Sequence, residues 1–428
     1  MSVQRAAPGQ RVTPLELFFD LVVVFAITQV TTFLSQNPTW GGLFRGMLLL
    51  GALWWAWSAY AWLTNALDPE EGYVRLAMFA AIAAMLIVSL AAPGAFGSDA
   101  LTFAIAYSVV RGLHLLLFAI AGRGDEDLLH AIARLAPAAA LASVLLVSAA
   151  VTHGPARLAL WSAAIAVIYL APLVYGMRGF HISPDHFVER YGLIIIIALG
   201  ESIVAIGVGA SGLDLDAGVI AAALLGFTVI ACLWWSYFDW SIYVARARLA
   251  EATGPARAAF ARDAYAYLHM PMVAGIVLFA FGLKTTLADV GGSLAIVPAL
   301  GLCGGIALYL IAHVVLRLRI GGGLGVGRPA ALVLVLALIG VAWAVPALAA
   351  LSLVASVCVA LIAYEFFRHR EGRAWIRARR GEFTLDEVRG VEARARSTTS
   401  RATSPDGDGA HDPGDAAIAE PAPQHDAP

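Results

Sequence analysis

The chain has 428 residues, of which 60% are hydrophobic and 14% are charged. This composition excludes an ordinary soluble globular protein, in which about a quarter of the residues are charged. The formal net charge is −2, and the charges are sorted by loop instead of gathered in one basic patch, so no nucleic-acid partner is expected. The composition indicates a protein whose main partner is the lipid bilayer.

The cysteines and the N-terminus add two further expectations. Cys232, Cys303 and Cys358 lie in separate apolar segments without the spacing of metal ligands, so we expect small buried residues and neither a metal, a disulfide nor a cofactor. Two arginines precede the first apolar segment, but no small-residue cleavage site follows it. That segment is therefore predicted to be a retained span and not a signal peptide.

Six apolar segments of the first half are each long enough to cross a hydrocarbon core of about 30 Å. The first begins with a helix-start pattern: Thr13 as the capping residue, Pro14 at the first helical position and Glu16 three residues after the cap. The fourth carries Arg111 and His114 in its interior. The predicted spans are residues 14–35, 41–64, 73–92, 100–121, 129–151 and 156–177.

The second half repeats this plan. Ser183 and Pro184 restart a helix, and the residues Leu-Trp-Trp occur at 53–55 and again at 233–235. The predicted spans are residues 184–209, 217–240, a span that begins near Tyr265, 294–316, 329–345 and 347–367. We therefore predict an all-α polytopic membrane protein of about 12 transmembrane helices in two six-helix repeats, which are parallel because each contains an even number of spans.

The loop charges predict how these spans are oriented. Arginines concentrate in alternate connections, so by the positive-inside rule both termini are expected in the cytoplasm of a bacterium, with the chain in its cytoplasmic membrane. The division is a cytoplasmic N-terminus (1–12), a first membrane repeat (13–178), a second membrane repeat (179–370) and a cytoplasmic tail (371–428). The tail lacks the apolar residues needed for a core, and we predict that it is disordered.

Two segments carry a resemblance to a known family. ELFFDL at residues 16–21, and ERYGL at 189–193 followed by LGES at 199–202, resemble the bacterial low temperature requirement A (LtrA) family. The resemblance covers most of residues 11–370. It implies an integral membrane protein, and the family's name implies a link to growth in the cold, which fits membrane adaptation as well as transport.

Two charges are predicted to lie deep in the membrane, where an ionisable side chain is a functional candidate. Glu201 lies roughly 18 Å along its helix from Glu189, at 1.5 Å per residue, and Thr28 and Gln29 have the matching depth in the first span, where we expect either to take part in helix packing or to bond a substrate. A buried carboxyl is expected to be protonated, so Glu201 either handles a proton or cation or is a structural group that joins two helices. Arg111 requires a carboxylate or carbonyl partner; the candidates are Glu201, Asp20 and Glu16, of which we expect Asp20 or Glu201.

Four further charged residues open the first and seventh spans. Glu16 and Asp20 are one helical turn apart, and either belongs to a site or has a local role, which for Glu16 is the capping pattern. Glu189 and Arg190 form an interfacial ion pair or contact these acids. The complete set of candidate ion or substrate site residues is Glu201, Arg111, Asp20, Glu16, Glu189, Arg190, His313 and His269.

The histidines inside the spans allow two interpretations. His114, His269 and His313 are either hydrogen-bonded packing residues or members of a proton relay. His313 has, relative to Tyr309, the spacing that Arg111 has relative to Tyr107. No metal site is expected, because the only nearby group of ligand types, at residues 181–186, is explained equally well by helix capping.

Three classes of function remain. The leading hypothesis is a transporter-like protein that moves a small solute, a proton or another cation by alternating access, with Glu201 and Arg111 as a mid-membrane charged site. The alternative is a sensor or accessory protein for cold or membrane adaptation. A membrane-embedded enzyme is not expected, because the polar residues are dispersed and show no catalytic triad, zinc motif or phosphate loop. The oligomeric state stays open.

Overall fold

The computed structural model describes residues 11–368 and the single residues 370, 375, 379, 384, 387 and 390. Two predictions fall largely outside the described residues: the cytoplasmic location of the N-terminal segment, and the cytoplasmic location and disorder of the tail. The described part is built from helices and contains no strand. The all-α prediction is confirmed.

The first half of the bundle consists of six helices whose ends agree closely with the predicted spans. Thr13 caps the first of them, and the Glu16 side chain bonds back to the Thr13 backbone, so the predicted capping box is present. The helices are α1 (Pro14–Gln36), α2 (Trp40–Thr64), α3 (Gly72–Ala91), α4 (Ala100–Ala121), α5 (Glu126–Val151) and α6 (Gly154–Tyr175).

The second half contains longer helical runs, three of which include a π-helical segment. The elements are α7 (Pro184–Ala210), α8 (Ala217–Ser236), η1 (Tyr237–Ser241), α9 (Ile242–Glu251), α10 (Gly254–Phe260), η2 (Ala261–Tyr267), α11 (His269–Ala288), α12 (Ile296–Ala299), η3 (Leu300–Gly304), α13 (Gly305–Ile320), α14 (Gly327–Ala342) and α15 (Ala347–Arg368). π-Helical segments frequently mark functional sites, because they interrupt the regular backbone hydrogen bonds.

Two of the predicted boundaries were wrong. The eighth span does not end at residue 240 but continues through η1 and α9 to Glu251. The ninth does not begin near Tyr265, because the helix already starts at Gly254, with Thr253 as its capping residue and a proline in its first turn. The apolar pattern ends before the helices do, because the helices continue through polar residues.

Eleven helices of the described chain are long and apolar enough to cross a bilayer. A twelfth apolar helix, α14, has 16 residues and is therefore about 24 Å long, somewhat less than the hydrocarbon core of about 30 Å. The helices expected from about twelve spans are thus present. A multi-pass protein embedded in the lipid bilayer follows from their length and composition.

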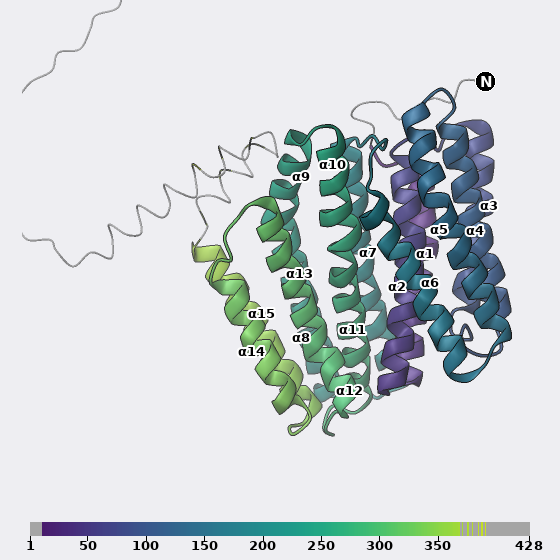
Figure 1. The fold of residues 1–428 in the computed structure, drawn as a ribbon. Coiled ribbons are helices and arrows are strands. Elements are labelled where there is room, and N and C mark those ends of the chain that lie inside the picture. The colour runs from purple at the N-terminus through teal and green to yellow at the C-terminus, as the bar shows by residue number, and fades with distance from the viewer. Residues whose placement is uncertain are drawn as a thin grey trace, which may run out of the picture.

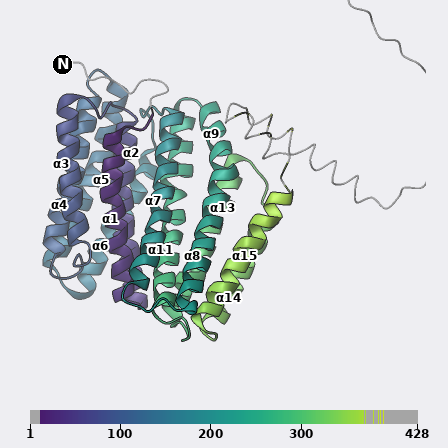
Figure 2. The same cartoon turned by 180° about the vertical axis from the view of Figure 1, so that it is seen from behind.

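The helices stand roughly side by side, with α1–α6 on one side of the molecule and α7–α15 on the other (Figures 1 and 2). The two halves have a similar order of neighbours. In the first half, α1 contacts α2 and α3, and the contacts then run from α3 through α4 and α5 to α6. In the second half, α7 contacts α8 and α11, and the contacts then run from α11 through α13 and α14 to α15. The last helix of each half also contacts its second, α2 with α6 and α8 with α15. Two parallel repeats would have this pattern; the repeats and the cytoplasmic termini stay predictions.

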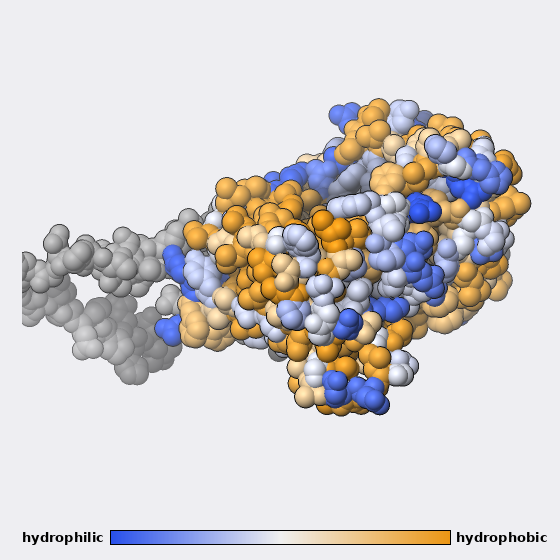
Figure 3. All heavy atoms as spheres, turned by 90° about the horizontal axis from the view of Figure 1, so that it is seen from below, coloured by the Kyte–Doolittle hydropathy of each residue, from blue (hydrophilic) through white to orange (hydrophobic). Residues whose placement is uncertain are grey.

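The core lies where the two halves meet. The helices α1 and α2 contact α7 and α11 across this boundary. The most apolar stretch of α2 is 83% buried, compared with 22% for α5 at the periphery. Seen from below, hydrophobic and hydrophilic side chains are mixed over the end of the bundle (Figure 3). Many large hydrophobic side chains of the helices are exposed, among them Leu76, Val174 and Leu224, which suits a lipid environment.

Glycines bring two helices of the second half into close contact. A Cβ atom added to Gly275 of α11 would lie 2.5 Å from the carbonyl oxygen of Gly305 in α13, and one added to Gly282 would lie 2.5 Å from the backbone nitrogen of Leu302. Small residues of this kind allow the backbones of membrane helices to approach each other. The contact of α11 with α13 and with η3, which contains Leu302, therefore depends on the absence of side chains at these positions.

Candidate functional site

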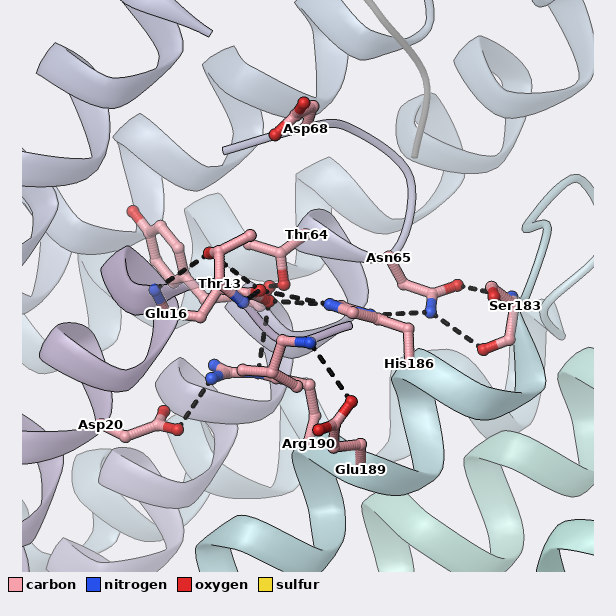
Figure 4. A network of polar contacts seen from close by, with 12 residues as sticks. Thr13, Glu16, Asp20, Thr64, Asn65, Asp68, Ser183, His186, Glu189 and Arg190 are labelled. Atoms are coloured by element: carbon pink, nitrogen blue, oxygen red, sulfur yellow. Dashed lines mark hydrogen bonds and ion pairs between the residues drawn. The ribbon is translucent and has the colours of Figure 1, made fainter. Parts of the chain in front are cut away.

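Four charged or titratable side chains meet where α1 and α7 begin. Glu16 and Asp20 on α1 face His186 and Arg190 on α7 (Figure 4). We call these four residues the ion cluster. Each pair is spaced by four residues, which places both members on one face of its helix, and all four are at most 1% exposed. The cluster joins the first half of the bundle to the second.

Arg190 is the cation of the ion cluster. Its Nη1 donates to Asp20 Oδ2 at 2.7 Å, and its Nε lies 3.5 Å from Glu16 Oε1. The guanidinium also lies over the ring of Trp57, 5.8 Å from the centroid, and Trp57 Nε1 donates to the other oxygen of Asp20 at 2.8 Å. Both oxygens of Asp20 therefore accept hydrogen bonds, as expected for an ionised carboxylate.

His186 is held in one tautomer by its two neighbours. Its Nδ1 lies 3.2 Å from Asn65 Nδ2, which is a donor, so Nδ1 accepts. Its Nε2 then donates to Glu16, at 3.1–3.2 Å from the two carboxylate oxygens. Asn65 also bonds the backbone nitrogen and oxygen of Ser183, at 2.9 and 3.2 Å, and so caps α7, whose own Ser183 side chain makes no capping bond.

These protonation states leave the ion cluster with two carboxylates and one guanidinium. Glu16 lies in the first turn of α1, and His186 places it beside the first turn of α7. A helix N-terminus carries about half a positive charge, so two of them together offset the excess negative charge. Glu16 Oε1 and Arg190 Nε lie 3.5 Å apart and form no hydrogen bond with the described residues, but their opposite charges offset each other. The ion cluster is therefore a charge-compensated structural junction between α1 and α7.

Glu189 does not join the ion cluster, although it is adjacent to Arg190 in sequence. Its carboxylate accepts a hydrogen bond from the backbone nitrogen of Val12 at 3.2 Å, in an exposed position (Figure 4). This contact ties the segment before α1 to α7. Arg190 therefore contacts the acids of the first span, as one of the two predicted roles required, whereas Glu189 does not.

Glu201 forms a second, separate link between the halves. It is 1% exposed and accepts a hydrogen bond from the hydroxyl of Thr28 on α1, the residue at the matching depth of the first span. Two turns further along α7, Gly209 packs against the backbone of Lys284 in α11. Glu201 therefore lies in the boundary between α1, α7 and α11, towards the ends of α7 and α11.

Arg111 has none of the partners that we expected for it. Asp20 is bonded to Arg190 and Trp57, and Glu201 to Thr28, so the expected pairing with either acid was wrong. Arg111 is 6% exposed, and its Nε and Nη1 atoms have no hydrogen-bond partner among the described residues. Arginine keeps its proton, which leaves a buried and uncompensated positive charge near the middle of α4.

A cavity of about 90 Å³ lies beside Arg111, several times the space of about 10–15 Å³ that one water requires. Its walls come from α2, α4, α5 and α6, and Arg262 and Ala266 of η2 close one side from the second half. Among the described residues, no acidic one lines it. The lining residues are Trp55, Ser58, Ala59, Trp62, Arg111, His114, Leu115, Phe118, Ile132, Leu135, Ala138, Ala139, Ile168, Ala171, Pro172, Met177, Phe180, Arg262 and Ala266.

The second guanidinium of the cavity is already paired. Arg262 lies 2.7 Å from Asp263 through its Nη2 and donates through Nη1 to the carbonyl oxygen of Pro172 at 3.0 Å. The sequence did not single out Arg262, because its arginine-rich segment was assigned to a cytoplasmic connection. Among the polar side chains of the cavity, Arg111 is thus the charged one that lacks a partner. We call this space the Arg111 cavity.

The three intramembrane histidines do not form one relay. His114 lines the Arg111 cavity in the first half. His269 and His313 lie in the second half, on either side of Tyr237, whose hydroxyl is 2.8 Å from His269 Nε2 and whose ring centroid is 6.1 Å from that of His313. His269 also bonds the carbonyl oxygen of Ala264 at 2.8 Å and is a satisfied packing residue. The described residues hold no group of three or more potential ligands positioned for a metal ion.

One buried ion pair escaped the sequence analysis. Arg328 of α14 bonds Glu365 of α15 at 2.8 Å and the carbonyl oxygen of Ser236 at 3.0 Å, and both charged residues are 7% exposed. An arginine and a glutamate at the ends of two apolar segments were the available signal. The same carbonyl oxygen of Ser236, at the start of the π-helical turn, also accepts a hydrogen bond from the hydroxyl of Ser241 at 3.2 Å.

The fold and these buried charges define a multi-pass α-helical membrane protein whose two halves are joined by ionic and polar contacts. Residues 11–363 match the family model described as bacterial low temperature requirement A protein (LtrA), and the chain belongs to this family. It is also 32% identical over 285 residues to "Uncharacterized protein RA0937" of Rhizobium meliloti (strain 1021), covering 64% of this chain and 69% of that one. No solved structure matches it.

Proposed function

We propose that this LtrA-family protein is a transporter-like protein of the bacterial cytoplasmic membrane, and that the Arg111 cavity binds the anionic group of a small solute. One observation carries the proposal: the buried guanidinium of Arg111 lines a cavity to which the described residues contribute no acid that could neutralise it. A buried charge without a partner costs several kcal/mol, and intramembrane charges usually mark a substrate or ion pathway. A bound anion would supply the missing partner.

The position of the cavity fits alternating access. Its walls belong to the first half, but η2 of the second half closes one side, where Trp54 Nε1 donates to the carbonyl oxygen of Ala266 at 2.8 Å. A relative movement of the two halves would therefore open or close the cavity at η2. Rocking of one repeat against the other is the usual mechanism of transporters built from two repeats.

Glu201 has a separate role in this proposal. It lies at the boundary that must move, bonded across it to Thr28, so a change in its protonation would alter the contact between the halves. The expected single site of Glu201 and Arg111 thus becomes two: a solute site at Arg111 and a coupling site for a proton or cation at Glu201. A carboxyl that bridges two moving parts can link ion binding to movement.

The test has two stages on the purified full-length protein. Carboxylates of two to five carbons are first screened for thermal stabilisation at constant ionic strength, because a ligand that binds the folded state raises its stability by about 2.7 kcal/mol at 100 times Kd. Uptake of the stabilising anion into proteoliposomes is then measured. Arg111→Gln should abolish both signals, whereas Arg45→Gln, which removes a guanidinium that bonds its own helix at Gly41, should preserve them.

The results separate the two classes of function. Stabilisation and uptake that both depend on Arg111 support transport. Stabilisation without uptake favours the sensor or accessory class, in which the same cavity reports the presence of an anion. No response of the wild-type protein to any small anion would refute the proposal.

A further inference from the structure

Lys284 is the only lysine among the 28 lysine and arginine residues of the chain. It lies near the end of α11, within a helical run that is long and apolar enough to cross a bilayer, and its side chain is half-buried. A lysine can give up its proton when it is desolvated, whereas an arginine keeps its charge. Of these 28 residues, Lys284 is therefore the one suited to exchange a proton.

Lys284 packs against α7, which runs in the same direction as α11. Near the starts of the two helices, the ring of Tyr191 lies 5.4 Å from that of His269. Near their ends, a Cβ atom added to Gly209 of α7 would lie 3.6 Å from the Cα atom of Lys284. The Cα–Cβ bonds of a helix tilt towards its N-terminus, so the side chain of Lys284 starts beside Gly209 and is tilted back along α7.

Glu201 lies in that direction. It precedes Gly209 by eight residues, or roughly 12 Å along the helix axis, and residues spaced by four lie on one face of a helix. Ala205, halfway between them, is small and buried, so α7 places no large side chain between Lys284 and Glu201. Among the described residues, Lys284 is the cation whose charge acts on Glu201.

The other charged groups on the elements packed against α7 do not face Glu201. The ion cluster lies where α1 and α7 begin, and η1 and α9 carry their charges at that same end, where Arg246 pairs with Asp185. At the end where Lys284 lies, Arg45 of α2 bonds its own helix at Gly41. The carboxylates of that end are exposed; they belong to Asp214, Asp216 and Asp289.

Glu201 and Lys284 belong to the second half of the bundle, whereas Thr28, which bonds Glu201, belongs to the first. A movement between the halves would withdraw Thr28 and leave Lys284 in place. A carboxylate within the membrane then requires a proton or a cation. We infer that Lys284 completes the coupling site: its ammonium group is the counter-charge of the ionised Glu201 and sets how readily this carboxylate takes up a proton. The inference rests on the coupling site of the proposed function and adds its second residue.

The single lysine allows a direct measurement on the detergent-purified full chain. Reductive methylation with isotope-labelled formaldehyde marks Lys284 and the terminal amine for NMR, and Lys284→Arg identifies the lysine signal by removing it. The pH at which this signal is half titrated reports the proton affinity of Lys284. A nearby carboxylate stabilises the ammonium form, so this midpoint should lie about one pH unit lower in Glu201→Gln than in the wild-type protein.

Asp289→Asn is the matched control, because it removes an exposed carboxylate just past the end of α11. Salt and water screen exposed charges, so this substitution should change the midpoint of Lys284 by no more than about 0.3 pH unit. Equal midpoints in the wild-type protein and Glu201→Gln would overturn the inference. Equal effects of Glu201→Gln and Asp289→Asn would also overturn it.

Thermal unfolding tests the same pair without a label. In alkaline buffer, Lys284→Gln should lower the unfolding midpoint of the wild-type protein but not that of Glu201→Gln, whereas Lys284→Arg, which keeps the charge, should stay close to the wild type. The double-mutant cycle attributes the difference to the pair. A loss of stability that is the same in both backgrounds would show a role of Lys284 in packing alone and would contradict the inference.

Failure of the inference differs from failure of the proposed function. If Lys284 titrates independently of Glu201 while uptake still depends on Arg111, Lys284 has no part in coupling and the transporter proposal stands. If no anion stabilises the protein, the transporter proposal fails even where Lys284 and Glu201 are coupled. Where uptake is observed, Lys284→Gln should shift its pH dependence to higher pH, because Glu201 then takes up a proton more readily.

Discussion

We expect substitution by methionine to have opposite effects on stability at two buried arginines, Arg190 and Arg111. Arg190 compensates two carboxylates of the ion cluster, at 2.7 Å from Asp20 and 3.5 Å from Glu16. Arg190→Met keeps an apolar side chain of similar length but leaves both acids buried and unpaired. Removing one partner of a buried ion pair typically costs about 3–5 kcal/mol, and the lost contact with the face of Trp57 adds to this cost. We expect a large loss of stability.

Arg111→Met should act in the other direction. The substitution removes a buried cation that has no acidic partner, and with it two donor atoms that have no hydrogen-bond partner among the described residues. An unsatisfied buried donor costs about 1–3 kcal/mol. Its replacement by an apolar side chain should therefore stabilise the ligand-free protein by about 1–3 kcal/mol, at the expense of anion binding.

Thermal unfolding in one detergent, at one scan rate and without added anions, measures both effects. The scan rate is fixed because membrane proteins commonly unfold irreversibly. Arg45→Met is the control, since a peripheral arginine should change stability by no more than about 0.5 kcal/mol. A double-mutant cycle of Arg190→Met with Asp20→Asn should show strong coupling, because the two residues share a hydrogen bond.

The sign of the stability change in Arg111→Met tests whether Arg111 lacks a compensating partner. If Arg111→Met destabilises the ligand-free protein as strongly as Arg190→Met, then Arg111 has a compensating partner in the folded protein. In that case the cavity holds no unpaired charge, and the case for an anion site fails. If both variants are neutral, burial of these charges carries no cost, and the interpretation of the ion cluster is also wrong.

Two more predictions concern helix contacts. Gly275→Ala should lower the unfolding midpoint by the equivalent of about 1–3 kcal/mol, because the new methyl group would meet the carbonyl oxygen of Gly305. The control is Gly340→Ala, where a Cβ would touch nothing within 4 Å, and it should be neutral or slightly stabilising. Equal effects of the two substitutions would refute the close packing. Glu201→Gln keeps an acceptor for Thr28, so it should change stability by less than about 1 kcal/mol while removing the pH dependence of uptake in proteoliposomes; an unchanged pH profile would exclude Glu201 as the coupling group.

The positions of the helices could be predicted from the sequence because length, hydropathy and capping are local properties. The start of α1 is predicted by three residues within a stretch of four, Thr13, Pro14 and Glu16, and the structure has this capping box. The π-helical turns could not be predicted, since no distinct residue pattern specifies them. The sequence also did not predict that the eighth helical run continues to Glu251 or that the ninth begins at Gly254. Polar residues end the apolar pattern there, but they do not end the helix.

The partners of the buried charges were harder to predict, because they depend on how each helix is rotated about its axis. Depth along the helix was correct for Glu201 and Thr28, which do meet. Depth alone also made Asp20 and Glu201 plausible partners for Arg111, yet Arg111 faces α2, α5 and α6 instead. The interior of a membrane protein and the lipid around it are similarly apolar, so hydropathy does not show which face of α4 points inwards.

The two halves differ in how they compensate a buried arginine, and this difference favours a solute site in the first half. Helices α14 and α15 have neighbours that correspond to those of α5 and α6, and α8, like α2, contacts the first and the last helix of its half. Where the first half has the Arg111 cavity, these helices of the second half hold Arg328, paired with Glu365 and bonded to Ser236. His313, which has the place of Arg111, donates through Nδ1 to the carbonyl oxygen of Tyr309 at 3.1 Å.

The second half therefore supplies its own carboxylate to its buried arginine, whereas the first half supplies none. An internal acid makes an external anion unnecessary, so the Arg328–Glu365 pair suits a scaffold and the unpaired Arg111 suits a binding site. If this asymmetry is functional, introducing an acid beside Arg111 should convert the first half to the state of the second. Ala139→Glu, at a buried position of α5 that lines the cavity, should abolish anion binding while retaining the fold, and persistent binding in this variant would contradict the assignment.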